Sequence, residues 1–286
     1  MKKSEILEER KLFYRYFYKI ENSKNVELAF ECFSQFLNFK DYDLNENLFK
    51  KFVRESCDLY REVAYHNSDH ALNTLNSGVY LLKSLKKYYN NNVNLEILFL
   101  LACYLHDIDH PGSKEFKNDS LEIEEHHIRV IKTQMNKFKD LFYDKKLRIC
   151  DEIGLLSDLI YSTNLVNHQK ILNEFTEKYF LDEKMEILKQ KPEIGPLELK
   201  MLIKIADISA SYKSFESYRL NSIILHKEVK GKSFNINQID NKMEANFLKN
   251  VALPLIKIFC RVFKGQDFMI ENCEANIKEL ERIDSK

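Results

Sequence analysis

Apolar residues recur three or four positions apart along most of the chain, and this spacing constrains the fold more than any other feature. Three stretches show it clearly: Ile97, Leu98, Leu101, Ala102 and Leu105; Leu147, Cys150, Ile153, Leu156 and Ile160; and Leu248, Val251, Leu255, Ile258, Phe259 and Val262. Such spacing places apolar side chains on one face of an α-helix. Glycine and proline, which interrupt helices, number only 6 and 4 among 286 residues. The sequence therefore predicts an all-α fold, a compact assembly of roughly ten or more helices.

The few helix-breaking positions refine this prediction. Pro196 suits the first turn of a helix that runs through Met201 to about Ala210. Pro254 lies inside an apolar helical stretch and predicts a kink there. Residues 233–239 alternate like a strand, but the stretch is too short to build a sheet.

Charge and cysteine usage exclude several classes of protein. Lys plus Arg and Asp plus Glu each total 44, so no net field draws the chain to nucleic acid or to an anionic membrane. The six cysteines include no CxxC pair, which is typical of reduced thiols in the cytoplasm. The N-terminus, MKKSEILEER, lacks the apolar stretch of a signal peptide. The longest apolar run, Ile97 to Leu105, is about half the length of a membrane span. We expect a soluble cytoplasmic protein.

His66 and His70 are the first pair of candidate functional residues. They stand four positions apart, so on a helix they would share one face and point into one site. Such a pair taken alone is more often a surface pair or a structural pair than a functional one.

The sequence HDIDHPG, which begins at His106, is a stronger signal. It follows directly on an apolar run, and Pro111 must break that helix. His106, Asp107 and His110 are therefore expected at its exposed C-terminal tip. Burying the apolar run places these groups at the edge of the core, where charge is costly without a partner such as a metal ion.

Asp207 is the third signal, because it is a lone carboxylate on a mostly apolar helix. It could face solvent, since Lys204 indicates that this helix has a wet side. It could equally face a metal site. Two histidines and two aspartates form a sound donor set for zinc, with waters completing the coordination.

Five segments together resemble the catalytic domain of the class I cyclic nucleotide phosphodiesterases. They are YHNSDHA from Tyr65, HDIDHPG, EEHH at 124–127, STNLVNH at 162–168 and ADISASYKSFESYR at 206–219, in the order of that family. The similarity runs from about Tyr60 to Phe259. It implies a phosphodiesterase-type all-helical domain of the histidine-aspartate metal hydrolases, which hydrolyses a 3′,5′-cyclic nucleotide such as cGMP or cAMP to the 5′-nucleotide.

The resemblance also implies two divalent metal ions. The first, usually zinc, would be bound by four residues: His70, His106, Asp107 and Asp207. The second, usually magnesium or manganese, would share Asp107 and otherwise bind mostly waters. Three residues match positions that hydrogen-bond those waters: His110, Glu124 and Thr163.

The mechanism implied by the family combines these metals with a histidine acid. A water that bridges two cations is a hydroxide at neutral pH and attacks a phosphate whose charge the metals neutralise. His66 would protonate the leaving ribose 3′-oxygen, and Glu228 would orient His66 and keep it cationic. Both residues are therefore assigned to catalysis.

The predicted base site departs from the family pattern. The family clamps the base between a phenylalanine and an aliphatic residue, which match Phe247 and Leu225, and reads it with a glutamine, where this chain has Glu244. Tyr65 and Leu165 are also expected to contact substrate. An ionised carboxylate only accepts hydrogen bonds, which suits guanine N1–H and N2–H₂ and not adenine N1.

A second departure points the same way. Ala210 stands where the family has an asparagine, as in some members that hydrolyse cGMP. Both departures favour guanine. The alternative is that Glu244 is an exposed helix residue outside the pocket.

Other functions remain open at this point. The segments after HPG and between Glu228 and Glu244 are short, so the site could be more open and accept a cyclic dinucleotide or another phosphoester. A non-catalytic nucleotide-binding protein on this scaffold is a second alternative, although the complete metal set argues against it. The expected partner is a small-molecule nucleotide, and no oligomeric state is predicted.

The absence of repeats and of Pro/Gly/Ser-rich linkers predicts one catalytic domain over 1–286. We expect N-terminal helices in 1–58, a metal- and nucleotide-binding core in 59–264 and a C-terminal helix in 265–286, without a separate regulatory domain.

Overall fold

The computed structural model describes residues 22–89, 93–112, 121–142, 149–181, 189–231, 234–236 and 239–285. The α-helices are α2 (Asn22–Ser34), α3 (Glu46–Asp58), α4 (Ser68–Ser84), α5 (Val93–Leu105), α6 (Glu122–Lys137), α7 (Lys139–Phe142), α8 (Ile153–Thr163), α9 (His168–Tyr179), α10 (Pro196–Asp207), α11 (Phe215–Lys230), α12 (Asn241–Phe247), α13 (Leu253–Val262) and α14 (Asp267–Asp284). Within these ranges no strand forms, including the described part of 233–239, so the all-α prediction is confirmed.

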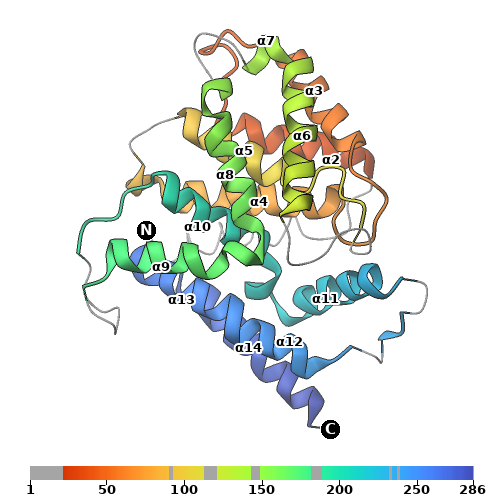
Figure 1. The fold of residues 1–286 in the computed structure, drawn as a ribbon, viewed down its shortest axis with the longest axis vertical. Coiled ribbons are helices and arrows are strands. Elements are labelled where there is room, and N and C mark those ends of the chain that lie inside the picture. Colours follow the sequence, from red (N-terminus) through yellow and green to blue (C-terminus); the bar gives the residue numbers. More distant parts are fainter. Residues whose placement is uncertain are drawn as a thin grey trace.

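The helices form two groups that meet at α10. Helices α2 to α8 lie in the upper part of Figure 1, and α9 and α11 to α14 lie in the lower part. Helix α10 packs against α4, α5 and α8 on one side and against α9 and α13 on the other. A side chain at the C-terminal end of α10 therefore lies between the two groups.

Helix α5 runs through the middle of the upper group. Its side chains from Ile97 to Leu105 are all buried, so it contacts other helices on every side. It crosses α4 at Gly78, where an added Cβ would lie only 2.9 Å from the Cys103 Sγ. Helices α4 and α5 therefore pack closely at this point, with no room for a side chain on Gly78.

The prediction of an exposed helix tip at HDIDHPG was wrong. Helix α5 ends at Leu105, before the motif, and the chain turns sharply with Asp109 at a φ of 57°. The His106 side chain is only 1% exposed, and His110 is also buried. The motif is a tight turn buried against α4 and α10, since the His106 Nε2 lies 3.3 Å from both the His70 Nε2 and an Asp207 oxygen.

Helix α10 begins with Pro196 in its first turn, as predicted, and ends at Asp207, earlier than expected. Its predicted wet side at Lys204 was wrong. Lys204 is 3% exposed. Its ammonium group donates a 2.7 Å hydrogen bond to the Ser162 carbonyl oxygen at the end of α8. Helices pack on both sides of α10, so the buried ammonium group of Lys204 needs a hydrogen-bond partner inside the protein.

The predicted kink at Pro254 takes the form of a wide helical turn. The residues Leu248–Ala252, between α12 and α13, form a π-helical turn, and Pro254 follows in the first turn of α13. Proline offers no N–H and crowds the preceding turn, so the widened turn accommodates it. This turn sets how α12 faces α11.

None of the described helices is long and apolar enough to span a membrane. The five cysteines whose side chains the structure describes are free thiols.

Candidate active site

The turn before α4 places His66 and His70 in one site. Asn67 caps the helix, and its side chain accepts hydrogen bonds from the backbone N–H groups of Asp69 and His70. His66 therefore precedes the helix, and the prediction that both histidines share one helix face was wrong. Their ring centroids are nevertheless only 6.0 Å apart, because the chain bends over residues 64–67, just before the helix begins.

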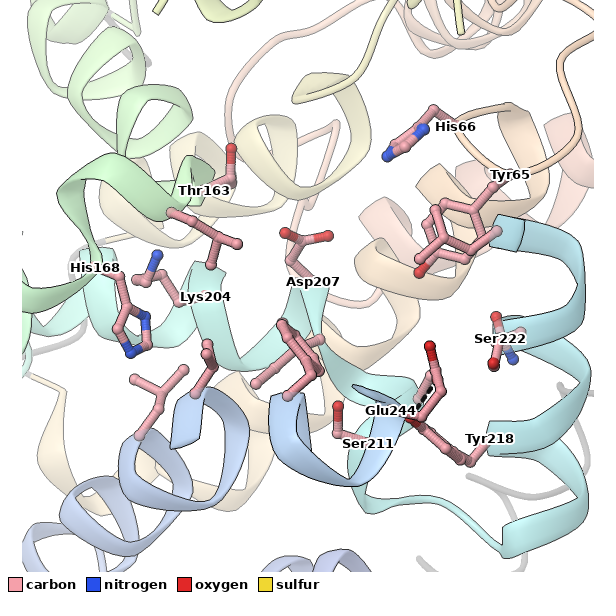
Figure 2. A pocket seen from close by; sticks show the side chains of 18 of the residues that line it. Tyr65, His66, Thr163, His168, Lys204, Asp207, Ser211, Tyr218, Ser222 and Glu244 are labelled. Atoms are coloured by element: carbon pink, nitrogen blue, oxygen red, sulfur yellow. Dashed lines mark hydrogen bonds between the residues drawn. The ribbon is translucent and has the colours of Figure 1, made fainter. Parts of the chain in front are cut away.

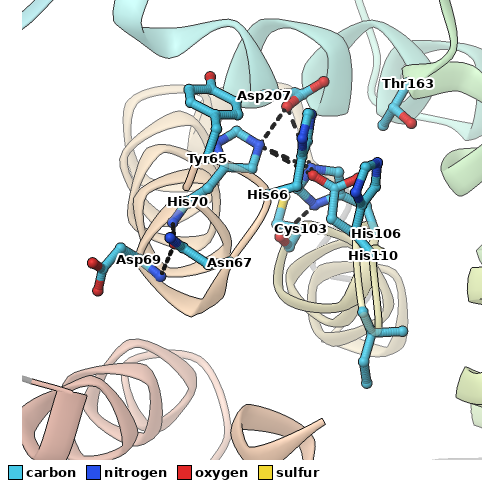
Figure 3. Close-up of polar contacts among 12 residues, drawn as sticks. Tyr65, His66, Asn67, Asp69, His70, Cys103, His106, His110, Thr163 and Asp207 are labelled. Atoms are coloured by element: carbon cyan, nitrogen blue, oxygen red, sulfur yellow. Dashed lines mark hydrogen bonds and ion pairs between the residues drawn. The ribbon is translucent and has the colours of Figure 1, made fainter. Parts of the chain in front are cut away.

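Four predicted metal ligands converge between α4, α5 and α10. Figure 3 shows three of them, His70, His106 and Asp207. The His70 Nε2 lies 3.0 Å from an Asp207 oxygen and 3.4 Å from an Asp107 oxygen. The His106 Nε2 lies 3.3 Å from the Asp207 oxygen, 3.1 Å from the Asp107 oxygen and 3.3 Å from the His70 Nε2. Zinc bonds of about 2.0–2.2 Å to nitrogen and oxygen require tetrahedral edges of about 3.3–3.6 Å. These donors are thus spaced almost as zinc ligands require.

The tautomer of His106 also fits a metal. Its Nδ1 lies 3.1 Å from the Cys103 carbonyl oxygen, which can only accept a hydrogen bond. The Nδ1 must therefore carry the proton, and in the neutral ring the Nε2 lone pair points at the cluster. Together with His70 and Asp207, whose donor atoms lie within 4.8 Å of one another, His106 can hold a metal ion.

The electrostatics of the cluster favour positive charge at its centre. Burial alone would lower the pKa of His106, but the Asp107 and Asp207 carboxylates outweigh it and raise that pKa well above its usual range. Burial would raise the pKa of Asp207, but His106 and His70 outweigh it and hold that pKa well below its usual range. Two carboxylates facing two imidazoles in a buried site stabilise a cation between them.

His66 and Glu228 form a tight pair beside this cluster. The Glu228 Oε1 lies 2.6 Å from the His66 Nδ1, and its Oε2 accepts hydrogen bonds from the backbone N–H groups of Tyr65 and His66. Burial would raise the pKa of Glu228, but these hydrogen bonds lower it to about 2. The Nδ1 of His66 is thus engaged, and its Nε2 is free to exchange a proton with a ligand.

His110 is a neutral imidazole stacked on His66. The ring centroids are 4.1 Å apart, and burial lowers the pKa of His110 to about 3. Its Nδ1 accepts a hydrogen bond from the Gly112 N–H, so the proton lies on Nε2. His110 is therefore a hydrogen-bond donor, consistent with the predicted contact to a water.

Glu124 lies on α6, and Thr163 is the last residue of α8. Glu124 accepts a 2.9 Å hydrogen bond from the Asn164 side chain, while its buried Oε2 has no partner among the described residues. The Thr163 hydroxyl donates to the Ile160 carbonyl oxygen, so its own lone pairs can still accept a hydrogen bond. Both residues thus present acceptors, the groups that a metal-bound water needs.

A cavity of about 430 Å³ opens beside the cluster (Figure 2). Every residue predicted to bind substrate lines it: Tyr65, Leu165, Leu225, Glu244 and Phe247. His66, Thr163 and Asp207 also line it, so the predicted acid and one metal ligand face the same space.

Glu244 is a pocket residue. Its side chain is 14% exposed, which excludes the alternative of an exposed helix residue. One carboxylate oxygen lies 2.6 Å from the Tyr218 hydroxyl and the other 2.9 Å from the His226 Nε2.

Several polar residues of this site were not found from the sequence. They are Asn164, His168, Lys204, Tyr218 and His226. Lys204, a single charge within an apolar helical stretch, carried a detectable signal but was interpreted as solvent-facing. The others carry no local signal, because Asn164, Tyr218 and His226 contact carboxylates on other helices, and His168 is buried by the packing of distant segments. The short segment after HPG falls outside the described residues.

Comparison with known proteins agrees with this geometry. The family model for 3′5′-cyclic nucleotide phosphodiesterase matches residues 65–273. The curated cGMP-specific 3′,5′-cyclic phosphodiesterase of Drosophila virilis is 26% identical over 236 residues, which cover 71% of this chain and 26% of that protein. That of Drosophila yakuba is equally similar, and the chain covers 20% of it. The chain therefore spans about a quarter or less of the curated relatives it matches.

Solved structures share the fold. The phosphodiesterase domain of the RhoPDE fusion protein from the choanoflagellate Salpingoeca rosetta matches with a TM-score of 0.79 at 20% identity, over 93% of both chains. The structure of LmjPDEB1 in complex with IBMX matches with a TM-score of 0.77 at 18% identity, over 96% of this chain and 91% of that one.

The fold is shared with these phosphodiesterase domains, and the cluster of histidines and aspartates could hold a metal ion. Because the family model matches most of the chain, this protein belongs to the 3′5′-cyclic nucleotide phosphodiesterase family. The family recognised from the motifs is therefore confirmed. The family is one of phosphoric diester hydrolases that use divalent metals, and the residues present here fit such a metal.

Proposed function

We propose that this protein hydrolyses a 3′,5′-cyclic nucleotide to the 5′-nucleotide and prefers cGMP to cAMP. The observation that carries the proposal is the placement of a metal-binding cluster and an acid pair on one cavity. His66 and Asp207 line the same cavity, so the proposed acid and one proposed metal ligand face the space that a cyclic phosphate would enter.

The metal set of the proposal follows the donor types. Zinc at His70, His106, Asp107 and Asp207, with magnesium or manganese beside Asp107, would supply the charge that activates a water and neutralises the phosphate. His110, Glu124 and Thr163 orient waters at this position through one donor and two acceptors.

His66 acts as the general acid. The ribose 3′-oxygen is a poor leaving group and needs a proton as its bond to phosphorus breaks. Glu228 accepts from the His66 Nδ1, so it stabilises the imidazolium and directs Nε2 into the cavity. After transfer the neutral ring keeps the same hydrogen bond, which fixes its tautomer.

Glu244 selects the base. As an acceptor in the cavity, it suits the N1–H and N2–H₂ donors of guanine. Phe247 and Leu225 line the same cavity and would supply apolar contact to a base. Adenine presents a lone pair at N1, which an ionised carboxylate repels.

The test is steady-state hydrolysis of cGMP, cAMP and a cyclic dinucleotide with added magnesium or manganese. We expect 5′-GMP as the main product and a kcat/KM for cGMP about tenfold or more above that for cAMP. Glu244→Gln should shift this ratio towards cAMP while hydrolysis continues. Absence of 5′-nucleotide product from any substrate would refute the assignment, and faster turnover of the dinucleotide would replace the mononucleotide.

A further inference from the structure

Glu244 has two hydrogen-bonding neighbours, and both lie on α11. Tyr218 is in the first turn of that helix and His226 is two turns further on. Each contacts a different carboxylate oxygen, at 2.6 Å and 2.9 Å. Both carboxylate oxygens are thus fixed before any ligand enters, as Figure 2 shows for the Tyr218 contact.

The direction of the Tyr218 hydrogen bond is settled by its surroundings. Burial, together with the neighbouring Glu244 carboxylate, raises the pKa of Tyr218 above its usual range. The hydroxyl keeps its proton and donates it to Glu244. One oxygen of Glu244 is therefore already an acceptor in the free protein.

The second carboxylate oxygen of Glu244 faces the imidazole of His226, which is also buried. The His226 side chain is 8% exposed, and its Nε2 is directed at the carboxylate. A proton on Nε2 gives a charge-assisted hydrogen bond that stabilises the ionised carboxylate. With donors on both oxygens, the remaining lone pairs of Glu244 are left for a ligand.

We propose that His226 is the positioning residue that sets the base preference of this site, by donating from Nε2 to Glu244 and fixing the orientation of that side chain as an acceptor for guanine. This inference rests on the proposed function and adds to it the residue that makes Glu244 selective. Tyr218 alone would hold one carboxylate oxygen and leave the other without its donor, so the side chain could turn within the cavity and selectivity would fall.

The position of His226 separates this role from the chemistry. Glu228, which pairs with His66, lies two residues further along α11, so the two side chains leave the helix in different directions. Changing the contact of His226 should therefore alter KM for the nucleotide and leave kcat nearly unchanged.

Two variants of similar chemistry test the proposal. In His226→Gln the amide nitrogen reaches about as far as Nε2 and can still donate to Glu244. In His226→Asn the side chain is one methylene shorter and cannot. His226→Leu fills the volume without a donor, and it carries the same prediction should the asparagine variant be too unstable to assay.

We measure kcat and KM for cGMP and cAMP with each variant and with Glu244→Gln. His226→Gln should keep the cGMP-to-cAMP ratio of kcat/KM within about threefold of wild type. The asparagine and leucine variants should lower it about tenfold or more, mainly through KM for cGMP, as expected for a lost hydrogen bond to a charged group.

The outcomes separate the two proposals. A wild-type ratio in the asparagine and leucine variants, with a changed ratio in Glu244→Gln, overturns the role of His226 and keeps that of Glu244. The role of His226 is also overturned if His226→Gln loses selectivity to the same extent as His226→Asn. An unchanged ratio in Glu244→Gln removes base reading from both residues, and lack of turnover in wild type removes the proposed function itself.

Discussion

His66 is held on two sides, and this arrangement suits a proton donor. Glu228 accepts from its Nδ1 at 2.6 Å, and the neutral His110 ring stacks on it at 4.1 Å. A second cation in place of His110 would repel the imidazolium. The low pKa of His110 therefore keeps a second cation away from the proposed acid.

Replacing His66 by alanine should remove the acid and leave the metal cluster intact. We expect kcat to fall by about 10²–10⁴-fold, because general acid catalysis contributes that much. Bound metal, measured by elemental analysis, should stay at the wild-type stoichiometry. Glu228→Gln, which keeps a hydrogen-bonding side chain but removes its charge, should lose less. A His66→Ala variant near full rate would assign the acid to another group.

His168 makes stability depend on pH. Its ring lines the cavity without a hydrogen-bond partner among the described residues. Burial and the nearby Lys204 lower the pKa of His168 from 6.5 to about 4. Between these values the unfolded chain binds more protons than the folded chain, so folding stability falls as pH drops.

The test compares unfolding by urea at about pH 7 and about pH 5. We expect the free energy of unfolding to be lower at the acidic pH, and His168→Phe to lose less of it than wild type. His110 and His127, with pKa values of about 3 and about 4, act in the same direction, so the variant should retain part of the pH dependence. An identical loss in both proteins would mean that His168 does not titrate in this range.

At the scale of helices, the contact between α4 and α5 positions two of the proposed metal ligands. His70 lies in the first turn of α4, and His106 follows directly after α5. The two helices meet at Gly78 and Cys103, and the Cys103 carbonyl oxygen accepts from His106. A change in the distance between these two helices would therefore change the distance between His70 and His106.

Gly78→Ala should push the helices apart. Its Cβ would lie 2.9 Å from the Cys103 Sγ and 3.2 Å from a Phe99 ring carbon. We expect a loss of about 1–3 kcal/mol in the free energy of unfolding, as for other overpacked cores, and weaker metal binding. The measurement is denaturant unfolding with and without zinc.

The double variant Gly78→Ala/Cys103→Ala provides the control. Removing the Sγ makes room for the new methyl group, so the double variant should be more stable than the sum of the two single effects predicts, by about 1 kcal/mol or more. Simple additivity would show that the helices relax without strain.

At the scale of the whole molecule, the metal cluster joins segments that are distant in the chain. His70, His106, Asp107 and Asp207 come from α4, the turn after α5 and the end of α10. Helix α10 in turn contacts both helix groups. A metal bound here would link α4, α5 and α10, and it would bind only the folded chain.

Removing metal should therefore lower thermal stability. Adding zinc to chelator-treated protein at about 100 times the dissociation constant should contribute about 2.7 kcal/mol and raise Tm by several degrees. Calorimetry or thermal denaturation followed by circular dichroism measures this shift. Asp207→Ala should abolish it, and an equal shift in that variant would place the metal elsewhere.

The sequence contains enough local information to predict the helices and most of the ligands. Apolar spacing and scarce helix breakers predict helices because the periodicity of a helix involves only near neighbours. HDIDHPG is recognisable as a candidate metal-binding motif for a similar reason, since a charge next to a buried stretch is costly wherever the chain folds. The segment order then identified the family.

Only the tertiary structure decided where the polar side chains point. Glu228 is 162 residues from His66, and Glu244 is 26 and 18 residues from Tyr218 and His226. The burial of Lys204 and of the turn after α5 was predicted wrongly. These features depend on which helices pack against one another, and the hydrogen bond or ion pair that a charged group makes in the core is supplied by a distant segment.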